Sequence, residues 1–328
     1  ARRARSGHDS LAVTLELRPW MHLWPDGWSV AEHCKVGRRS TDHRHAEINR
    51  IDRGVAVQVH LFGSIDIELG ERRLAARSFG GRKPKQLMEI LLLRRGHPVP
   101  ADELALLLWP GDASVGDPAT VQHYLSVLRR RLQHAQGGKG SLLRHVHGGY
   151  ELDQDLFDLD LDRFDAAVAA ADCAPTARRR SLVTRALELV TGEVLADEPD
   201  AAWALDTRLR YRRAHTRLLL QASAMALAAA EPGVARDLAL AAGAHEPYAE
   251  PAACMLIAAY AMRGDRTAAL AAYEDCRAGL SDNLGVDPMP QTVAMAQAVL
   301  TDAPVAHLVT HALRVAQVQS PDCDRIPA

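Results

Sequence analysis

Aromatic residues make up only 5% of this 328-residue sequence, and long uninterrupted apolar runs are missing. Since about 18–20 apolar residues are needed to cross a bilayer, we expect no membrane segment. The five cysteines are widely scattered without a CxxC pair, which favours a reducing compartment over a disulfide framework. Arg18 and Pro19 break the stretch that follows the N-terminal arginines, so we expect no signal peptide and a cytoplasmic protein.

The sequence also lacks the motifs of common enzymes. A GxxxxGK[ST] loop, GxSxG and HExxH are all missing, and the GGKGS segment at 137–141 lacks the leading part of a phosphate-binding loop. His33, Cys34, His43 and His45 are metal-binding residue types, but without a second cysteine pair we interpret their spacing as chance rather than as a zinc site. We therefore expect no catalysis, no metal and no cofactor.

Alanine and leucine are abundant, which favours helices because both lose little entropy in a helix. The charge is uneven along the chain. Residues 57–153 contain 13 Lys and Arg against 10 Asp and Glu, whereas residues 154–300 contain 14 against 21. A mildly basic segment joined to an acidic one indicates that the first segment, and not the second, contacts a polyanion.

The first part of the chain changes character at Val57. Residues 1–55 have no sustained hydrophobic period, and we expect them to be disordered. From Val57 the pattern predicts short strands at 57–74, helices at 83–96, 100–110 and 118–133, and two short strands around a Gly-Gly turn at 142–152. This order of strands, three helices and hairpin outlines a winged helix-turn-helix with an extra sheet in front, at 57–153.

From about residue 161 the sequence is typical of helices throughout. VARDLALAA at 234–242 resembles RTAALAAYE at 266–274, an offset of 32 residues. This offset is close to the 34-residue period of tetratricopeptide helix pairs. The sequence therefore predicts a mainly helical protein with a small β part, in which a tetratricopeptide-like helical domain covers 158–301. We expect a loose tail at 302–328.

The third predicted helix has two distinct faces at 100° per residue. One face is apolar and must be buried: it carries Val121, Tyr124, Leu125, Leu128 and Leu132. The opposite face and its flanks carry groups that can contact phosphates or base edges: Gln122, His123, Ser126, Val127, Arg129, Arg130 and Gln133. Periodicity alone also fits an ordinary solvated face.

The surroundings of this helix favour DNA binding. Three consecutive arginines, 129–131, lie near its end, and the predicted hairpin carries Arg144, His145 and His147. A helix in the major groove with a hairpin in the adjacent minor groove is a known way to bind DNA.

Several stretches resemble known bacterial regulators. FGSIDIELG, GRKPKQLMEILLL, ELALLLWP, TVQHYLSVLRRRL and GGYEL, in this order, resemble the OmpR-type winged helix. AAYAMRGDRTAALAAYEDCRAGLSDNLGVDPMP resembles the end of the bacterial transcriptional activation domain. Together they resemble the Streptomyces antibiotic regulatory protein family over roughly residues 57–301, and the LGVDP segment is the most distinctive piece.

The resemblance implies a transcriptional activator that reads direct repeats in promoter DNA upstream of secondary-metabolite genes. It also implies a helical domain that supports a homodimer on DNA and contacts RNA polymerase. Trp109 and Tyr150 stand where related proteins contact the phosphate backbone, although each fits a packing role equally well. Val127 and His147 depart from the family pattern, because many relatives have arginine at both positions.

An interaction protein is the alternative interpretation. The helical domain would then be a scaffold that binds a peptide or a protein, and the winged helix would be only a docking module. The arginines at 129–131 favour DNA, whereas the modest charge and Val127 favour the alternative. Ionic strength distinguishes them, because phosphate contacts release counterions and protein docking largely does not.

Overall fold

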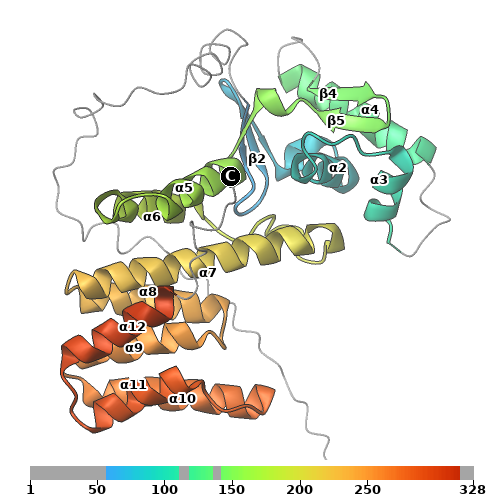
Figure 1. Ribbon diagram of the computed structural model, residues 1–328. Coiled ribbons are helices and arrows are strands. Elements are labelled where there is room, and N and C mark those ends of the chain that lie inside the picture. The colour runs from blue at the N-terminus through green and yellow to red at the C-terminus, as the bar shows by residue number, and fades with distance from the viewer. Residues whose placement is uncertain (1–56, 111–117, 136–141, 318–328) are drawn as a thin grey trace, which may run out of the picture. The chain divides into compact units, whose positions relative to one another are not determined.

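The computed structural model describes residues 57–110, 118–135 and 142–317 (Figure 1). The predicted disorder of 1–55 and the His33–Cys34 cluster therefore lie outside the described residues. Within the described part of the chain, every helix is too short or too polar to cross a membrane.

A four-stranded sheet opens the described chain, in the order β3–β2–β1–β6. Its first three strands, β1 (Val57–His60), β2 (Asp66–Leu69) and β3 (Arg72–Ala75), are antiparallel neighbours. Alternation explains β1 and β2: in β1 the side chains of Val57 and Val59 are buried, whereas Gln58 between them is exposed, and β2 alternates in the same way. The fourth strand, β6 (Phe157–Leu159), follows the hairpin and pairs in parallel with β1, which the sequence did not predict.

The predicted order of strands, three helices and hairpin is present. A 3₁₀ turn, η2 (Ala76–Phe79), leads into the helices. The helices are α2 (Arg82–Leu93), α3 (Ala101–Leu108) and α4 (Pro118–Ala135), and the hairpin strands are β4 (Leu143–Val146) and β5 (Gly149–Leu152).

The hairpin turn is His147–Gly148, one residue earlier than the Gly-Gly turn that we predicted. Gly149 instead begins β5, next to Val99. A side chain at this glycine would collide with the Val99 carbonyl, and Val99 and Tyr150 exchange two backbone hydrogen bonds of 2.9 Å. Glycine is therefore required for the hairpin to lie this close to the start of α3.

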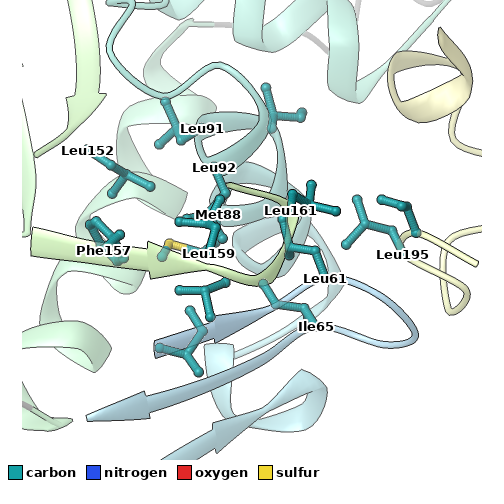
Figure 2. Packing of buried hydrophobic residues seen from close by; sticks show 14 of the residues in the cluster. Leu61, Ile65, Met88, Leu91, Leu92, Leu152, Phe157, Leu159, Leu161 and Leu195 are labelled. Atoms are coloured by element: carbon teal, nitrogen blue, oxygen red, sulfur yellow. The ribbon is translucent and has the colours of Figure 1, made fainter. Parts of the chain in front are cut away.

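One hydrophobic core joins the sheet, the helices and the hairpin (Figure 2). Leu87, Leu91 and Leu92 on α2 are fully buried, as expected from their helical spacing. Leu195, which lies far along the chain in the helical region, belongs to the same core.

The rest of the described chain is helical. After η3 (Gln154–Leu156) come α5 (Asp160–Asp172), α6 (Thr176–Leu189), η4 (Ala202–Ala204), α7 (Leu205–Ala228), α8 (Pro232–His245), α9 (Glu250–Met262), α10 (Arg266–Leu284), α11 (Pro290–Leu300) and α12 (Val305–Gln317). Consecutive helices from α5 to α12 pack against one another. Buried alanines such as Ala239, Ala242 and Ala258 permit this close packing.

The predicted loose tail is wrong for residues 305–317, which form α12. Leu308 and Ala312 are buried, and Val315 completes an apolar i, i+4, i+7 stripe. A stripe of three residues after Pro304 is too short to stand out in the sequence. The prediction for residues 318–328 lies outside the described residues.

The boundary predicted at 153–158 is crossed by hydrogen bonds. Leu195 donates its backbone N–H to the Leu61 carbonyl, and Ala196 donates to the Gly63 carbonyl, each at 2.9 Å. Gly63 in turn donates to the carbonyl of Glu193. The end of β1 is thus bonded to a segment of the helical region.

Candidate nucleic-acid interface

Helix α4 buries the face that its period predicts. Val121, Leu125, Leu128 and Leu132 are each at most 1% exposed, and α4 packs with them against α2 and α3. Tyr124 is only half-buried, and its ring lies 6.2 Å from the Trp109 ring. Burial of one face fixes the opposite face toward solvent.

The opposite face of α4 is polar and carries no carboxylate. Gln122, His123, Ser126, Arg130 and Gln133 are all exposed, and α4 contains no Asp or Glu. The Ser126 hydroxyl donates to the Gln122 carbonyl at 2.8 Å, so its lone pairs face outward as acceptors. This face therefore offers donors and acceptors of the kind that read base edges.

Val127 departs from the predicted exposed face, because its side chain is half-buried against the turn before α2. A Cβ placed on Gly80 would come within 2.9 Å of the Val127 methyl. Val127 lies at the edge of the α4 face, where η2 covers it. A contact between Val127 and a thymine methyl therefore has less room than the helical period indicates.

The arginines at the end of α4 carry unneutralised charge. Arg130 is exposed and Arg129 is half-buried. In the described ranges, neither guanidinium forms an ion pair with a carboxylate. Both groups are therefore available for phosphate oxygens, the contacts that supply most of the affinity in non-specific DNA binding.

Arg144 in the hairpin is already paired, unlike the α4 arginines. Its guanidinium lies 3.0 Å from a Glu151 oxygen and 3.3 Å from an Asp153 oxygen. These two carboxylates cancel the positive charge that the sequence led us to assign to a DNA contact. The assignment of Arg144 to the interface is weakened accordingly.

The hairpin histidines remain exposed. His147 lies in the turn, and His145 packs its ring 4.7 Å from the Tyr150 ring. Tyr150 is half-buried and pairs through its backbone with Val99. The hairpin thus exposes His145 and His147, and Tyr150 packs beside His145.

Trp109 is a packing residue with a cation beside it, at the end of α3. Its half-buried ring contacts Tyr124, and the Lys83 ammonium lies 5.0 Å from the ring centroid. Lys83 also donates to the Leu108 carbonyl at 2.6 Å, and burial lowers its pKa. Sequence reasoning missed Lys83, because only the fold brings the start of α2 to the end of α3.

A buried charge cluster ties α2 to the helical region. The Lys85 ammonium pairs with Asp197, with Glu198 at 2.8 Å and with Glu89 at 3.2 Å. Glu198 also accepts from Gln86 at 2.8 Å and from Arg82 at 3.0 Å. These hydrogen bonds outweigh burial and lower the pKa of Glu198.

Glu89 has the opposite environment within the same cluster. It is fully buried: the Lys85 ammonium lies 3.2 Å from Oε1, and Oε2 has no hydrogen-bond partner among the described residues. Burial therefore raises its pKa to about 8, although Lys85 opposes the shift. The cluster holds α2, and with it the α4 scaffold, to residues 197–198.

Among the described residues, no group of three or more His, Cys, Asp or Glu side chains is placed to hold a metal ion. The buried His215 packs its ring 4.9 Å from the His245 ring, and burial lowers the pKa of His215 to about 4. This histidine pair is therefore a packing contact.

Comparison with known proteins places the helical region in a defined family. Residues 159–300 match the family model of the bacterial transcriptional activator domain. The chain is 32% identical over 231 residues to the regulatory protein AfsR of Streptomyces griseus, covering 68% of this chain and 23% of AfsR. It thus spans about a quarter of the length of that relative.

Two mycobacterial regulators are similar over more of their own length. The transcriptional regulatory protein MoaR1 of Mycobacterium tuberculosis is 28% identical over 300 residues, covering 85% of this chain and 91% of MoaR1. EmbR of the same organism is 30% identical over 237 residues, covering 69% of this chain and 59% of EmbR.

A solved structure shares the fold. The structure of Mycobacterium tuberculosis EmbR in complex with a low affinity phosphopeptide matches with a TM-score of 0.67 and 24% identity. The match covers 81% of this chain and 70% of that chain. The fold of most of this chain is therefore one that a solved structure also has.

Proposed function

Because the chain belongs to the Streptomyces antibiotic regulatory protein family, we propose that it is a transcriptional activator that binds specific DNA sequences through α4. The observation that carries the proposal is the exposed, carboxylate-free face of α4, which ends in Arg129 and Arg130. The relatives named above are regulators, which supports the same class of function. In this proposal residues 57–153 act as a winged helix.

The residues of α4 divide into two roles. Gln122, His123 and Ser126 lie in the first half of the exposed face, where a recognition helix contacts base edges in the major groove. Arg129 and Arg130 bind phosphates, which fix the helix in the groove without reading sequence. Lys83, beside Trp109, adds a cation at the start of α2.

The hairpin is the second contact. His145 and His147 face the adjacent groove, and Tyr150 packs behind His145. Arg144 contributes little to phosphate binding, because Glu151 and Asp153 neutralise it. In this proposal Tyr150 and Trp109 pack behind the interface, against His145 and Tyr124, and do not donate hydrogen bonds to phosphates.

The helical region supplies activation. In this proposal residues 159–300 contact RNA polymerase and support a homodimer on direct repeats upstream of secondary-metabolite genes, and the protein acts in the cytoplasm. The family match and the similarity to AfsR support this part of the proposal.

Binding of the full chain to its own upstream intergenic DNA tests the proposal. We expect tight binding that unrelated competitor DNA does not displace and that weakens linearly with the logarithm of the salt concentration, by about 0.9 in slope per phosphate contact. The proposal also predicts that Arg130→Ala weakens this binding. Arg185→Ala, which removes an arginine from an exposed position on α6, is the matched control and leaves binding unchanged.

The opposite outcome supports the interaction-protein alternative. Binding no tighter than to random DNA, or affinity that does not respond to salt, would contradict DNA recognition by α4. The helical region, residues 159–300, would then be the place to search for a protein partner.

A further inference from the structure

A stretch rich in positive charge leads into α2. Residues 72–88 contain six Lys and Arg and no Asp or Glu, whereas acidic residues outnumber basic ones in the rest of the chain. The stretch covers β3, η2 and the first turns of α2. Of its six cations, the proposed function uses only Lys83. The role of the other five depends on which of them the fold itself neutralises.

Three of the six cations are neutralised within the fold. Arg73 pairs with Asp66, and the Arg82 guanidinium lies 3.0 Å from a Glu198 oxygen. Lys85 belongs to the buried charge cluster described above. The remaining three form no ion pair with a carboxylate of the described residues: Arg72, Arg77 and Lys83.

Helix α4 brings a fourth unpaired cation next to this stretch. A Cβ on Gly80, which follows η2, would come within 3.4 Å of the Arg131 Nε atom. Arg131 is exposed and forms no ion pair with a described carboxylate. Arg77 is exposed on η2, and the Arg72 guanidinium donates a hydrogen bond to the His134 carbonyl. The end of β3 and η2 therefore pack along the second half of α4.

These contacts fall on one side of α4. Tyr124, Val127 and Arg131 follow one another at i, i+3 and i+7, the spacing that places side chains on the same side of a helix. Tyr124 lies beside Trp109, and the Lys83 ammonium lies 5.0 Å from the centroid of the Trp109 ring. One side of α4 is thus bordered by cations from its first turns to its end.

The shape of DNA gives this border a partner. A helix about 10–12 Å across fills a major groove about 12 Å wide, so elements beside a recognition helix face the phosphates at the edge of the groove. Neither α4 nor the stretch from Arg72 to Met88 contains a carboxylate that would repel those phosphates. Arginine also presents its N–H donors in a planar fork, which matches the geometry of phosphate oxygens.

We propose that Arg72, Arg77 and Arg131 form a basic flank, which binds the phosphodiester backbone of DNA along one edge of the groove that α4 enters. The inference rests on the proposed function, because the flank meets that backbone only when α4 lies in the groove. The flank reads no sequence, and it fixes the angle and depth of the recognition helix. Its contacts add to those of Arg129 and Arg130.

Salt titrations of the full chain test the flank. Arg77→Ala and Arg131→Ala should each weaken binding to the upstream DNA and to unrelated DNA alike by at least about threefold, and should lower the salt slope by about one. Arg73→Ala is the matched control, because Arg73 is an exposed arginine on the same strand as Arg72 and Asp66 already neutralises it. This control should keep the salt slope of the unaltered chain. Thermal melting of each variant checks that the fold is intact.

Neutral methylphosphonates, substituted for one phosphate of the upstream DNA at a time, locate the contact. The unaltered chain should lose affinity at a short run of phosphates along one edge of the groove. Arg77→Ala should respond to all of these substitutions except the one that removes the partner of Arg77, because that contact is already gone. Equal responses of Arg77→Ala and the unaltered chain at every phosphate would mean that Arg77 contacts none of them and would overturn its place in the flank.

The outcomes separate the flank from the proposed function. A chain that prefers its upstream DNA, but whose salt slope neither Arg77→Ala nor Arg131→Ala changes, would overturn the flank and leave the proposed function standing. Binding of the unaltered chain no tighter than to random DNA would overturn the proposed function, and the flank with it.

Discussion

Asp160, the first residue of α5, accepts a 2.8 Å hydrogen bond from the backbone N–H of Leu61, which precedes it by 99 positions. The same carboxylate oxygen accepts from the N–H of Phe62 at 3.0 Å. Asp160 is 2% exposed, and burial raises its pKa despite these bonds. One carboxylate therefore satisfies two amides where β1 ends and holds them to the start of the helical region.

We expect Asp160→Ala to lower the free energy of unfolding by about 3 kcal/mol, since it leaves two buried amides without a partner. Urea denaturation of the full chain measures this change. Glu188→Ala, at an exposed position on α6, is the control, and its change should stay within about 0.5 kcal/mol. Equal effects of the two substitutions would mean that the amides find other partners.

Arg130→Ala should weaken binding to specific and unrelated DNA alike and reduce the salt slope by about one, because a phosphate contact carries no sequence information. Substitution of Gln122 or Ser126 should instead change base preference, by about 1–3 kcal/mol at one position. Salt titrations on the upstream DNA and on single-base variants of it separate the two effects. An unchanged salt slope for Arg130→Ala would remove Arg130 from the interface.

Arg144→Ala should weaken DNA binding less than Arg130→Ala, although both residues are arginines in the predicted interface. Arg144 is neutralised by Glu151 and Asp153, whereas Arg130 has no carboxylate partner among the described residues. Glu151→Gln should strengthen binding, because it frees part of the Arg144 charge. Parallel anisotropy titrations of the three variants measure the order, and a larger loss for Arg144→Ala would refute it.

Glu89 gives the stability of the fold a defined pH dependence. Its pKa is raised to about 8 in the folded chain from an ordinary value of 4.5. Between these values the folded chain keeps a proton on Glu89 that the unfolded chain releases. The contribution of Glu89 to the free energy of unfolding is therefore fully present below pH 4.5 and is lost as the pH rises toward 8. The slope from this group is at most about 1.4 kcal/mol per pH unit.

Glu89→Gln should flatten this dependence, because the amide stays neutral at every pH. Urea denaturation at several pH values between about 5 and 8 measures the slope for the variant and the unaltered chain. Glu188→Gln, at an exposed position on α6, serves as the control and keeps the slope of the unaltered chain. Identical slopes for Glu89→Gln and the unaltered chain would mean that Glu89 is ionised in the folded protein.

Periodicity in the sequence predicted the two faces of α4 because a helix places Val121, Leu125 and Leu128 on one side whatever surrounds it. It could not predict that Val127 is half-buried or that Arg144 forms an ion pair. Val127 is covered by Gly80, which lies on another element, and the pairing of Arg144 with Glu151 depends on hairpin register. The sequence therefore predicted which side of a single helix is buried. It did not predict contacts between residues of different elements.

Strand β6 and the segment at 193–196 were unpredictable for the same reason. Three residues of β6 carry too short an alternation to identify a strand, and the bonds from Leu195 to Leu61 join positions far apart in the sequence. The winged-helix assignment came from the order of strands, helices and hairpin, and the tetratricopeptide-like assignment came from the 32-residue offset; the family resemblance supports both, and they remain predictions in their details.

The backbone bonds from residues 193–196 to the end of β1 have a consequence for how this family can recombine. A crossover between two relatives near residue 155 would pair a sheet from one parent with β6, Leu195 and Glu198 from the other. Those partners meet inside a shared core, so such a chimaera would inherit mismatched interior surfaces. Parents that exchange residues 57–218 as one block keep this shared core intact, and the heritable module is thus longer than the segment 57–153 that we propose to contact DNA.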